Sequence, residues 1–105
     1  MCGISGFADF TKQTGNTVLE KMNRIMAHRG PDGEGYAIYQ PAGATVGFGH
    51  LRLSIIDLSE GGKQPKTFQH LHITFNGEVY NYAEIKNELE QKGHTFDSHS
   101  DTEVI

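Results

Sequence analysis

The only cysteine of this 105-residue chain is Cys2, directly after Met1. Removal of Met1, which a small second residue permits, would leave Cys2 with a free α-amino group beside its thiol. Such an amine has a pKa of about 7.7–8.0 and a thiol about 8.5, so the amine can accept the thiol proton near neutral pH. The thiolate is the nucleophile, and pairing a nucleophile with an N-terminal amine is a recognised way to activate it. Cys2 is therefore a candidate nucleophile, although a lone cysteine is more often a small packing residue.

A nucleophile that attacks a carbonyl also needs hydrogen-bond donors for the oxyanion. Asn76 and Gly77, in the stretch FNGEVYNY, could provide a side-chain amide and an unobstructed backbone N–H between an expected strand and an expected helix. Asn-Gly is also a common turn dipeptide. Taken alone, the pair is better explained as a turn.

Three charged residues are candidates for binding a substrate. Arg52 lies in the apolar run LRLSIID, where a charge is costly unless it is paired. Its guanidinium can hold a carboxylate through two hydrogen bonds, and a structural salt bridge to Asp57 explains it equally well. Glu78 and Asp101 could hold a substrate ammonium group, but each alone is more often a helix cap or a solvated residue.

Apolar residues that alternate predict strands, and apolar residues three or four positions apart predict helices. Strands are expected over residues 2–8, 35–40, 45–50, 71–76 and 94–98. Helices are expected over residues 18–28 and 81–93, and a further helix is expected to begin at residue 100. The glycines within residues 2–8 indicate close approach by another group.

The expected helices carry local signals. Over residues 18–28 the apolar stripe consists of Val18, Met22, Ile25 and Met26. Capping-box spacing is present in the pairs Thr17 with Glu20, Asn81 with Glu84, and Ser100 with Glu103. Gly93 is expected to end the helix over 81–93.

Composition excludes several classes of protein. The net charge is −4, from 9 basic and 13 acidic residues, and no basic patch indicates a nucleic-acid partner. No apolar run approaches the roughly 20 residues that span a membrane, and residues 1–20 lack the apolar stretch of a signal peptide. A single cysteine forms no internal disulfide, so a cytoplasmic setting is expected. No HExxH or GxxxxGK[ST] pattern indicates a metal or nucleotide site.

Six stretches together resemble one family. They are MCGISGF, HRGPDG, GHLRLSIIDLS, QP, FNGEVYNY and SDTEV, in this order along the whole chain. The sequence resembles class II glutamine amidotransferase domains. More narrowly, it is similar to the N-terminal glutaminase domain of glutamine-hydrolysing asparagine synthetases. The resemblance implies an α+β fold, the αββα sandwich of N-terminal-nucleophile hydrolases, with two antiparallel sheets between helical layers.

The resemblance also implies roles for single residues. Cys2 would attack the side-chain amide of L-glutamine, with its own amine as base, and a thioester would form and be hydrolysed. Asn76 and Gly77 would hold the oxyanion, and Arg52 would bind the α-carboxylate of glutamine. The remaining implied contacts are pocket walls from Leu53, Ser54, Ile55 and Ile56 and ammonium binding by Glu78 and Asp101.

The chain departs from the family pattern in three ways. Lys66 follows QP where a methionine is common, and Leu51 precedes the arginine where a polar residue is common. The domain of the family also continues past SDTEV. Residues 1–105 are thus expected to be the N-terminal portion of the domain, with ATP and Mg²⁺ used only by a separate C-terminal synthetase domain.

The resemblance implies an enzyme that supplies ammonia for the amidation of aspartate. Two alternatives to this function remain. The ammonia acceptor could be a different carboxylate. The chain could instead be a truncated, non-catalytic fragment, whose exposed sheet edges would favour association into a homo-oligomer.

Overall fold

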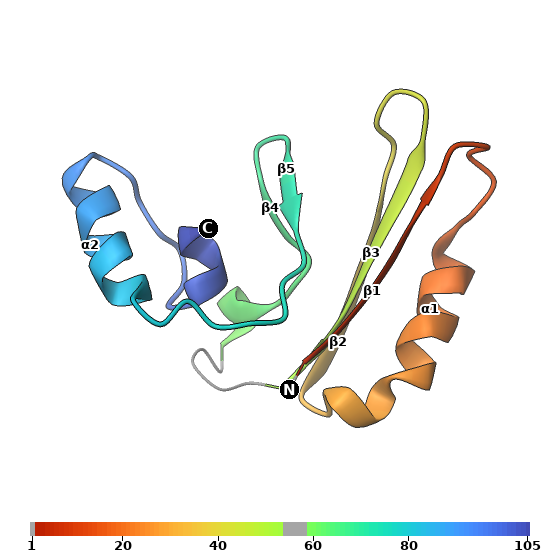
Figure 1. Cartoon of the computed structure of the whole chain (residues 1–105), viewed down its shortest axis with the longest axis horizontal. Helices are drawn as coiled ribbons and strands as arrows, with labels where there is room; N and C mark the ends of the chain where they lie inside the picture. Colours follow the sequence, from red (N-terminus) through yellow and green to blue (C-terminus); the bar gives the residue numbers. More distant parts are fainter. Residues whose placement is uncertain (1, 54–58) are drawn as a thin grey trace. The chain divides into compact units, whose positions relative to one another are not determined.

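The computed structural model describes residues 2–53 and 59–105 (Figure 1). They form two compact units. The first comprises residues 1–53 and 63–76, and the second comprises residues 54–62 and 77–105. The expected α+β class and the two antiparallel sheets are confirmed.

A three-stranded antiparallel sheet forms the centre of the first unit. Its strands are β1 (Gly3–Asp9), β2 (Gly33–Tyr39) and β3 (Thr45–Arg52), in the order β1-β3-β2. Gly3 pairs with Leu51 and Gly33 with Arg52, so the end of β3 lies between the start of β1 and the start of β2. The three strands expected from the sequence are therefore confirmed, within two residues at each end.

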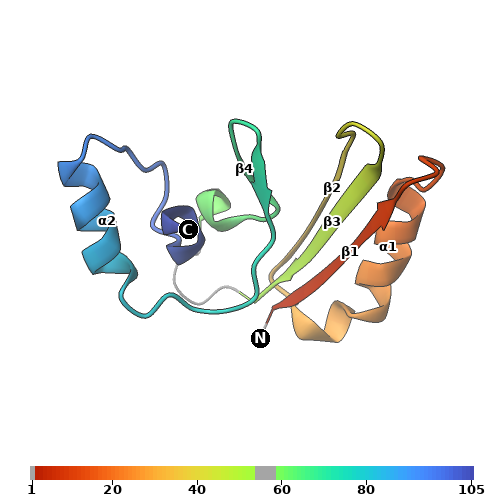
Figure 2. The same ribbon diagram turned by 45° about the horizontal axis from the view of Figure 1, so that its top comes forward.

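Helix α1 (Asn16–Ile25) covers one face of this sheet (Figure 2). It ends three residues before the expected end, and a 3₁₀ turn (Ala27–Arg29) follows. The predicted capping box at Thr17 is wrong, because Gly15 occupies the N-cap and no side chain caps the helix. The predicted stripe is also wrong in part: Leu19 is fully buried, whereas Ile25 is 78 % exposed.

Asn23 is the residue that the apolar pattern overlooked. It is buried on the sheet side of α1, one turn after Leu19. Its side-chain oxygen accepts a hydrogen bond from the Ser5 hydroxyl at 2.8 Å, and its amide donates to the Gly35 carbonyl at 3.3 Å. A buried amide is tolerated when its hydrogen bonds are satisfied. These bonds tie α1 to β1 and β2.

A two-stranded hairpin, β4 (Lys66–Phe68) and β5 (Leu71–Ile73), packs on the opposite face of the three-stranded sheet. His72 stacks on Tyr39 of β2 with ring centroids 3.7 Å apart. The Thr74 hydroxyl donates to the Gly49 carbonyl at 3.4 Å. The first unit thus has three layers: α1, the three-stranded sheet and the hairpin.

The expected strand over 71–76 ends early, at Ile73. The reason is visible at Phe75, whose backbone N–H donates to the side-chain oxygen of Gln64 at 2.6 Å. A side chain therefore takes the hydrogen bond that a neighbouring strand would otherwise provide.

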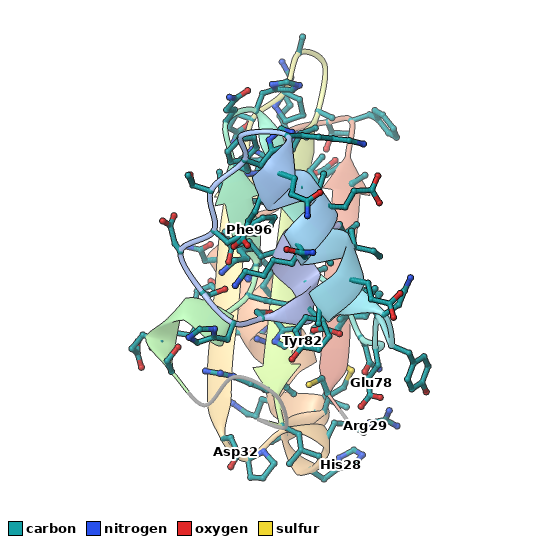
Figure 3. All side chains as sticks on the ribbon, turned by 90° about the vertical axis from the view of Figure 1, so that its left-hand side faces the viewer. His28, Arg29, Asp32, Glu78, Tyr82 and Phe96 are labelled. Atoms are coloured by element: carbon teal, nitrogen blue, oxygen red, sulfur yellow. The ribbon has the colours of Figure 1, made fainter. Side chains whose placement is uncertain are left out.

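The second unit contains helix α2 (Tyr82–Gln91) and two 3₁₀ turns, Glu60–Gly62 and Asp101–Val104. Asn81 is at the N-cap of α2, as expected, but its side chain makes no capping hydrogen bond. Gly93 ends the helix with a φ of +94°, a left-handed conformation that favours glycine. The Lys86 ammonium lies 5.5 Å from the centre of the Phe96 ring. Phe96 is labelled in Figure 3.

The strand expected over 94–98 is absent, and this prediction is wrong. The Glu103 carboxylate accepts hydrogen bonds from the backbone N–H groups of Asp97 and Ser98, at 2.8 and 2.9 Å. The expected cap at Ser100 is confirmed, because its hydroxyl accepts from the Thr102 N–H at 3.2 Å. The segment that follows is a 3₁₀ turn.

Asp9 organises the loop between β1 and α1. Its carboxylate accepts hydrogen bonds from the backbone N–H groups of Thr11, Gln13 and Thr14. The hydroxyls of the two threonines donate to the same carboxylate. These bonds, with the Thr11 hydroxyl contributing most, hold the pKa of Asp9 far below its usual value.

Replacing Asp9 with asparagine is expected to lower the melting temperature at pH 7 by roughly 4 °C. Because the pKa of Asp9 is depressed by folding, its stabilising effect is complete above the unfolded pKa of about 3.9 and is lost as the pH falls below it. The gap between wild type and variant should therefore shrink in thermal melts below about pH 4. Asp97→Asn, which removes an exposed charge, is the control and should leave the melting temperature nearly unchanged. An equal effect of both substitutions would contradict the prediction.

Candidate functional site

The half-buried thiol of Cys2 lies against the backbone of Leu53. The Leu53 N–H donates to Cys2 Sγ at 3.2 Å, and the thiol lies 3.5 Å from the Leu53 carbonyl as a donor. Leu53 was expected to form a pocket wall, and in the structure its backbone holds the candidate nucleophile.

Arg52 is the last residue of β3 and is 8 % exposed. Because side chains alternate along a strand, Arg52 and His50 point to the same face of the sheet. The hairpin packs on this face, opposite α1, and the register of β1 with β3 places Cys2 beside Arg52. The candidate nucleophile and the candidate carboxylate-binding residue therefore lie at the same end of the sheet.

The motif HRGPDG holds the backbone at the end of β3. A Cβ atom at Gly30 would lie 2.4 Å from the carbonyl carbon of Leu51, so only glycine allows this approach. The Asp32 N–H donates to the Arg52 carbonyl at 2.9 Å. Figure 3 shows His28, Arg29 and Asp32 together in the segment that follows α1. The motif thus positions the backbone of Arg52.

Asn76 follows β5 and is half-buried. The residue before it, Phe75, hydrogen-bonds through its backbone to the side chains of both Gln64 and His50. His50 lies on β3, two residues before Arg52. The first unit therefore carries Cys2, Arg52, Leu53 and Asn76, and it anchors the segment that leads into Asn76 to the face of the sheet that carries Arg52.

The second unit contains the other described candidates. Gly77 and Glu78 are exposed, and Glu78 is labelled in Figure 3. Asp101 is 8 % exposed, and its carboxylate accepts the Val79 N–H at 2.9 Å. Asp101 therefore holds the backbone next to Glu78. Three predicted pocket residues, Ser54, Ile55 and Ile56, lie outside the described residues, as does Asp57.

A hollow of about 270 Å³ opens on the α1 side of the sheet and is lined by Glu20, Asn23, Glu34 and Tyr36, among others. None of the predicted site residues lines it. Among residues 2–53 and 59–105, no cluster of three or more His, Cys, Asp or Glu side chains could hold a metal ion.

Comparison with known proteins identifies the family. The model of a family described as "Glutamine amidotransferase domain" matches residues 1–105. The chain belongs to this family. The resemblance noted in the sequence is thereby confirmed.

Curated relatives of this amidotransferase domain are longer proteins. "Asparagine synthetase [glutamine-hydrolyzing] 1" from Bacillus subtilis is 46 % identical over 113 residues, covering 100 % of this chain and 17 % of the relative. A putative asparagine synthetase [glutamine-hydrolyzing] from Methanocaldococcus jannaschii is 39 % identical, with 100 % and 23 % covered. "Amidase chry2" from Gibberella zeae is 36 % identical, with 100 % and 17 % covered. No solved structure gives a significant match.

The sequence motifs assigned no role to two residues that contact the backbone next to Asn76 in the amidotransferase domain. His50 and Gln64 stand within the motifs GHLRLSIIDLS and QP, so the signal was present. Their partner is the backbone of Phe75, which no side-chain pattern reveals. Within the described part of the amidotransferase domain, no helix is long and apolar enough to cross a membrane.

Proposed function

We propose that this domain hydrolyses L-glutamine to glutamate and ammonia through a thioester on Cys2. The observation that carries the proposal is the contact of the Cys2 sulfur with the Leu53 backbone, directly after Arg52. A nucleophile and a carboxylate-binding guanidinium at one end of a sheet suit an α-amino acid whose side chain is attacked. The names of the curated relatives, which include "glutamine-hydrolyzing", agree with this substrate.

In the proposed mechanism, Met1 is removed and the free amine of Cys2 takes the thiol proton. The thiolate adds to the side-chain carbonyl of glutamine, and the oxyanion accepts hydrogen bonds from the Asn76 amide and the Gly77 N–H. The C–N bond then breaks, and the amine of Cys2 returns its proton to the departing ammonia. Water hydrolyses the thioester, which releases glutamate and restores the thiol.

The α-amino acid part of glutamine is held by charged residues in this proposal. Arg52 binds the α-carboxylate, for which its planar guanidinium offers two parallel donors. Glu78 and Asp101 bind the α-ammonium group. The walls of the pocket come from Leu53, Ser54, Ile55 and Ile56.

The chain spans 17 % to 23 % of the length of the first two relatives described above. We propose that residues 1–105 are the N-terminal portion of a type 2 amidotransferase domain in a cytoplasmic asparagine-synthetase-like protein. A C-terminal synthetase domain, with ATP and Mg²⁺, would use the ammonia to amidate aspartate. The name "Amidase chry2" on a similar relative supports a second candidate, in which the acceptor is not aspartate.

The test uses the glutamine-like electrophile 6-diazo-5-oxo-norleucine and intact-mass spectrometry. The untreated protein should lack the mass of Met1. The treated protein should gain one adduct on Cys2, and excess glutamine should suppress it. Arg52→Lys should weaken protection by glutamine about tenfold or more, because lysine lacks the two-donor geometry. Absence of an adduct after Met1 removal would contradict the proposal and favour a non-catalytic fragment.

A further inference from the structure

Two motif residues to which the proposed mechanism assigns no role contact the backbone of the same residue, Phe75. Gln64 accepts a hydrogen bond from the Phe75 N–H, and His50 hydrogen-bonds to the Phe75 backbone. Phe75 directly precedes Asn76, the proposed oxyanion donor. The two side chains therefore act on the backbone from which the Asn76 amide extends.

Gln64 is itself held firmly. Its backbone carbonyl packs so closely on β2 that a Cβ atom at Gly35 would lie 2.1 Å from the carbonyl oxygen. Its side-chain oxygen is 2.6 Å from the Phe75 nitrogen, which is a short hydrogen bond. Gln64 therefore links the Phe75 N–H to β2, an edge strand of the three-stranded sheet.

His50 supplies the second contact, from the centre of that sheet. It is 2 % exposed, and its Nε2 has no hydrogen-bond partner among the described residues. The hydrogen bond to the Phe75 backbone therefore comes from Nδ1–H, which donates to the Phe75 carbonyl. Burial, and to a smaller extent the charge of Arg52, lower the pKa of His50.

We propose that His50 and Gln64 form a clamp on the backbone of Phe75, at its carbonyl and its N–H, that places the Asn76 amide for oxyanion binding, with His50 as a positioning residue. This inference rests on the proposed function. Pairing of β5 ends at Ile73, so among residues 2–53 and 59–105 no strand ladder extends to Asn76. An oxyanion donor must lie within about 2.7–3.1 Å of the developing charge, and a 1 Å misplacement can cost about 100-fold in rate. The hydrogen bonds from His50 and Gln64 hold the backbone next to Asn76 in place, where strand pairing has ended.

A pair of substitutions at His50 separates positioning from simple packing. His50→Asn keeps an N–H donor close to the position of Nδ1, whereas His50→Leu has similar branching and no donor. We expect His50→Leu to lower kcat for glutamine hydrolysis about 10- to 100-fold, with KM changed less than about threefold. His50→Asn should recover most of this loss. Equal kcat values for the two variants, or a change in KM alone, would overturn the clamp.

Gln64 provides an independent pair if His50→Leu fails to fold. Gln64→Glu keeps a side-chain oxygen that can accept the Phe75 N–H, and Gln64→Met removes it at similar length. The clamp predicts that Gln64→Met loses kcat by about 10-fold or more and that Gln64→Glu loses much less. Equal kcat values for Gln64→Met and Gln64→Glu would overturn the contribution of Gln64.

Hydrogen exchange at the Phe75 amide, measured by NMR on the full chain, tests the clamp without relying on activity. Exchange should be at least about tenfold faster in Gln64→Met and His50→Leu than in wild type and His50→Asn, at matched global stability. Unchanged exchange would overturn the clamp. Failure of the wild type to hydrolyse glutamine would instead overturn the proposed function, and the exchange rates would still decide whether the clamp exists.

Discussion

Replacing Cys2 with alanine is expected to reduce glutamine hydrolysis to the background rate, a loss of at least about 10⁴-fold in kcat. Cys2 provides the only thiol in the chain, so no other residue can form the proposed thioester. Its side chain is half-buried and hydrogen-bonds to the Leu53 backbone, so the melting temperature should change little. Glutamate release and thermal melts by circular dichroism measure the two effects.

A matched variant separates the role of the thiol from that of the amine. Inserting one alanine between Met1 and Cys2 keeps the thiol but moves the free amine one residue away. If the amine is the base, this insertion should also lower kcat by about 100-fold or more, the size of a general-base contribution. Full activity of the insertion variant would show that another group removes the thiol proton, and residual activity of Cys2→Ala would remove Cys2 from the mechanism.

Replacing Asn76 with alanine is expected to lower kcat about 10²- to 10³-fold, the usual effect of losing one oxyanion donor. KM should change less than about threefold, because the oxyanion exists only after the thiolate has added to the amide. Steady-state measurement of glutamate release separates the two constants.

The control for this change is Asn87→Ala, which removes an exposed asparagine from α2. It should leave both kcat and KM unchanged. An increase in KM alone for Asn76→Ala would reassign Asn76 to binding of glutamine. It would also remove the reason for the clamp on Phe75, so the two experiments constrain each other.

Local signals in the sequence predict those parts of the fold whose causes are local. The strands expected over 35–40 and 45–50 correspond to β2 and β3, which pair with each other. The glycine at position 93 predicts the end of α2, because its positive φ is a local requirement. These elements depend on neighbours in the chain, and they appear within a few residues of where the pattern places them.

Predictions failed where the backbone found a distant partner. The strand expected through residue 76 stops at Ile73, since the Phe75 N–H bonds to the side chain of Gln64. The strand expected over 94–98 does not form, and there the Glu103 carboxylate takes the free N–H groups. Asn23 is buried because Ser5 and Gly35 satisfy its amide across the sheet. The pattern of apolar residues within one segment does not indicate hydrogen-bond partners that lie in another segment.

The features of the candidate site also fall into two groups: those that the sequence predicts and those that only the tertiary structure shows. Six motifs in order along the chain nominate Cys2, Arg52 and Asn76 through the family that they resemble, although each residue taken alone has an equally good or better structural explanation. Only the tertiary structure shows that the Leu53 backbone contacts the thiol and that His50 and Gln64 hydrogen-bond to the Phe75 backbone. These contacts are made to backbone N–H and C=O groups, which every residue except proline carries and which therefore leave no mark in the sequence.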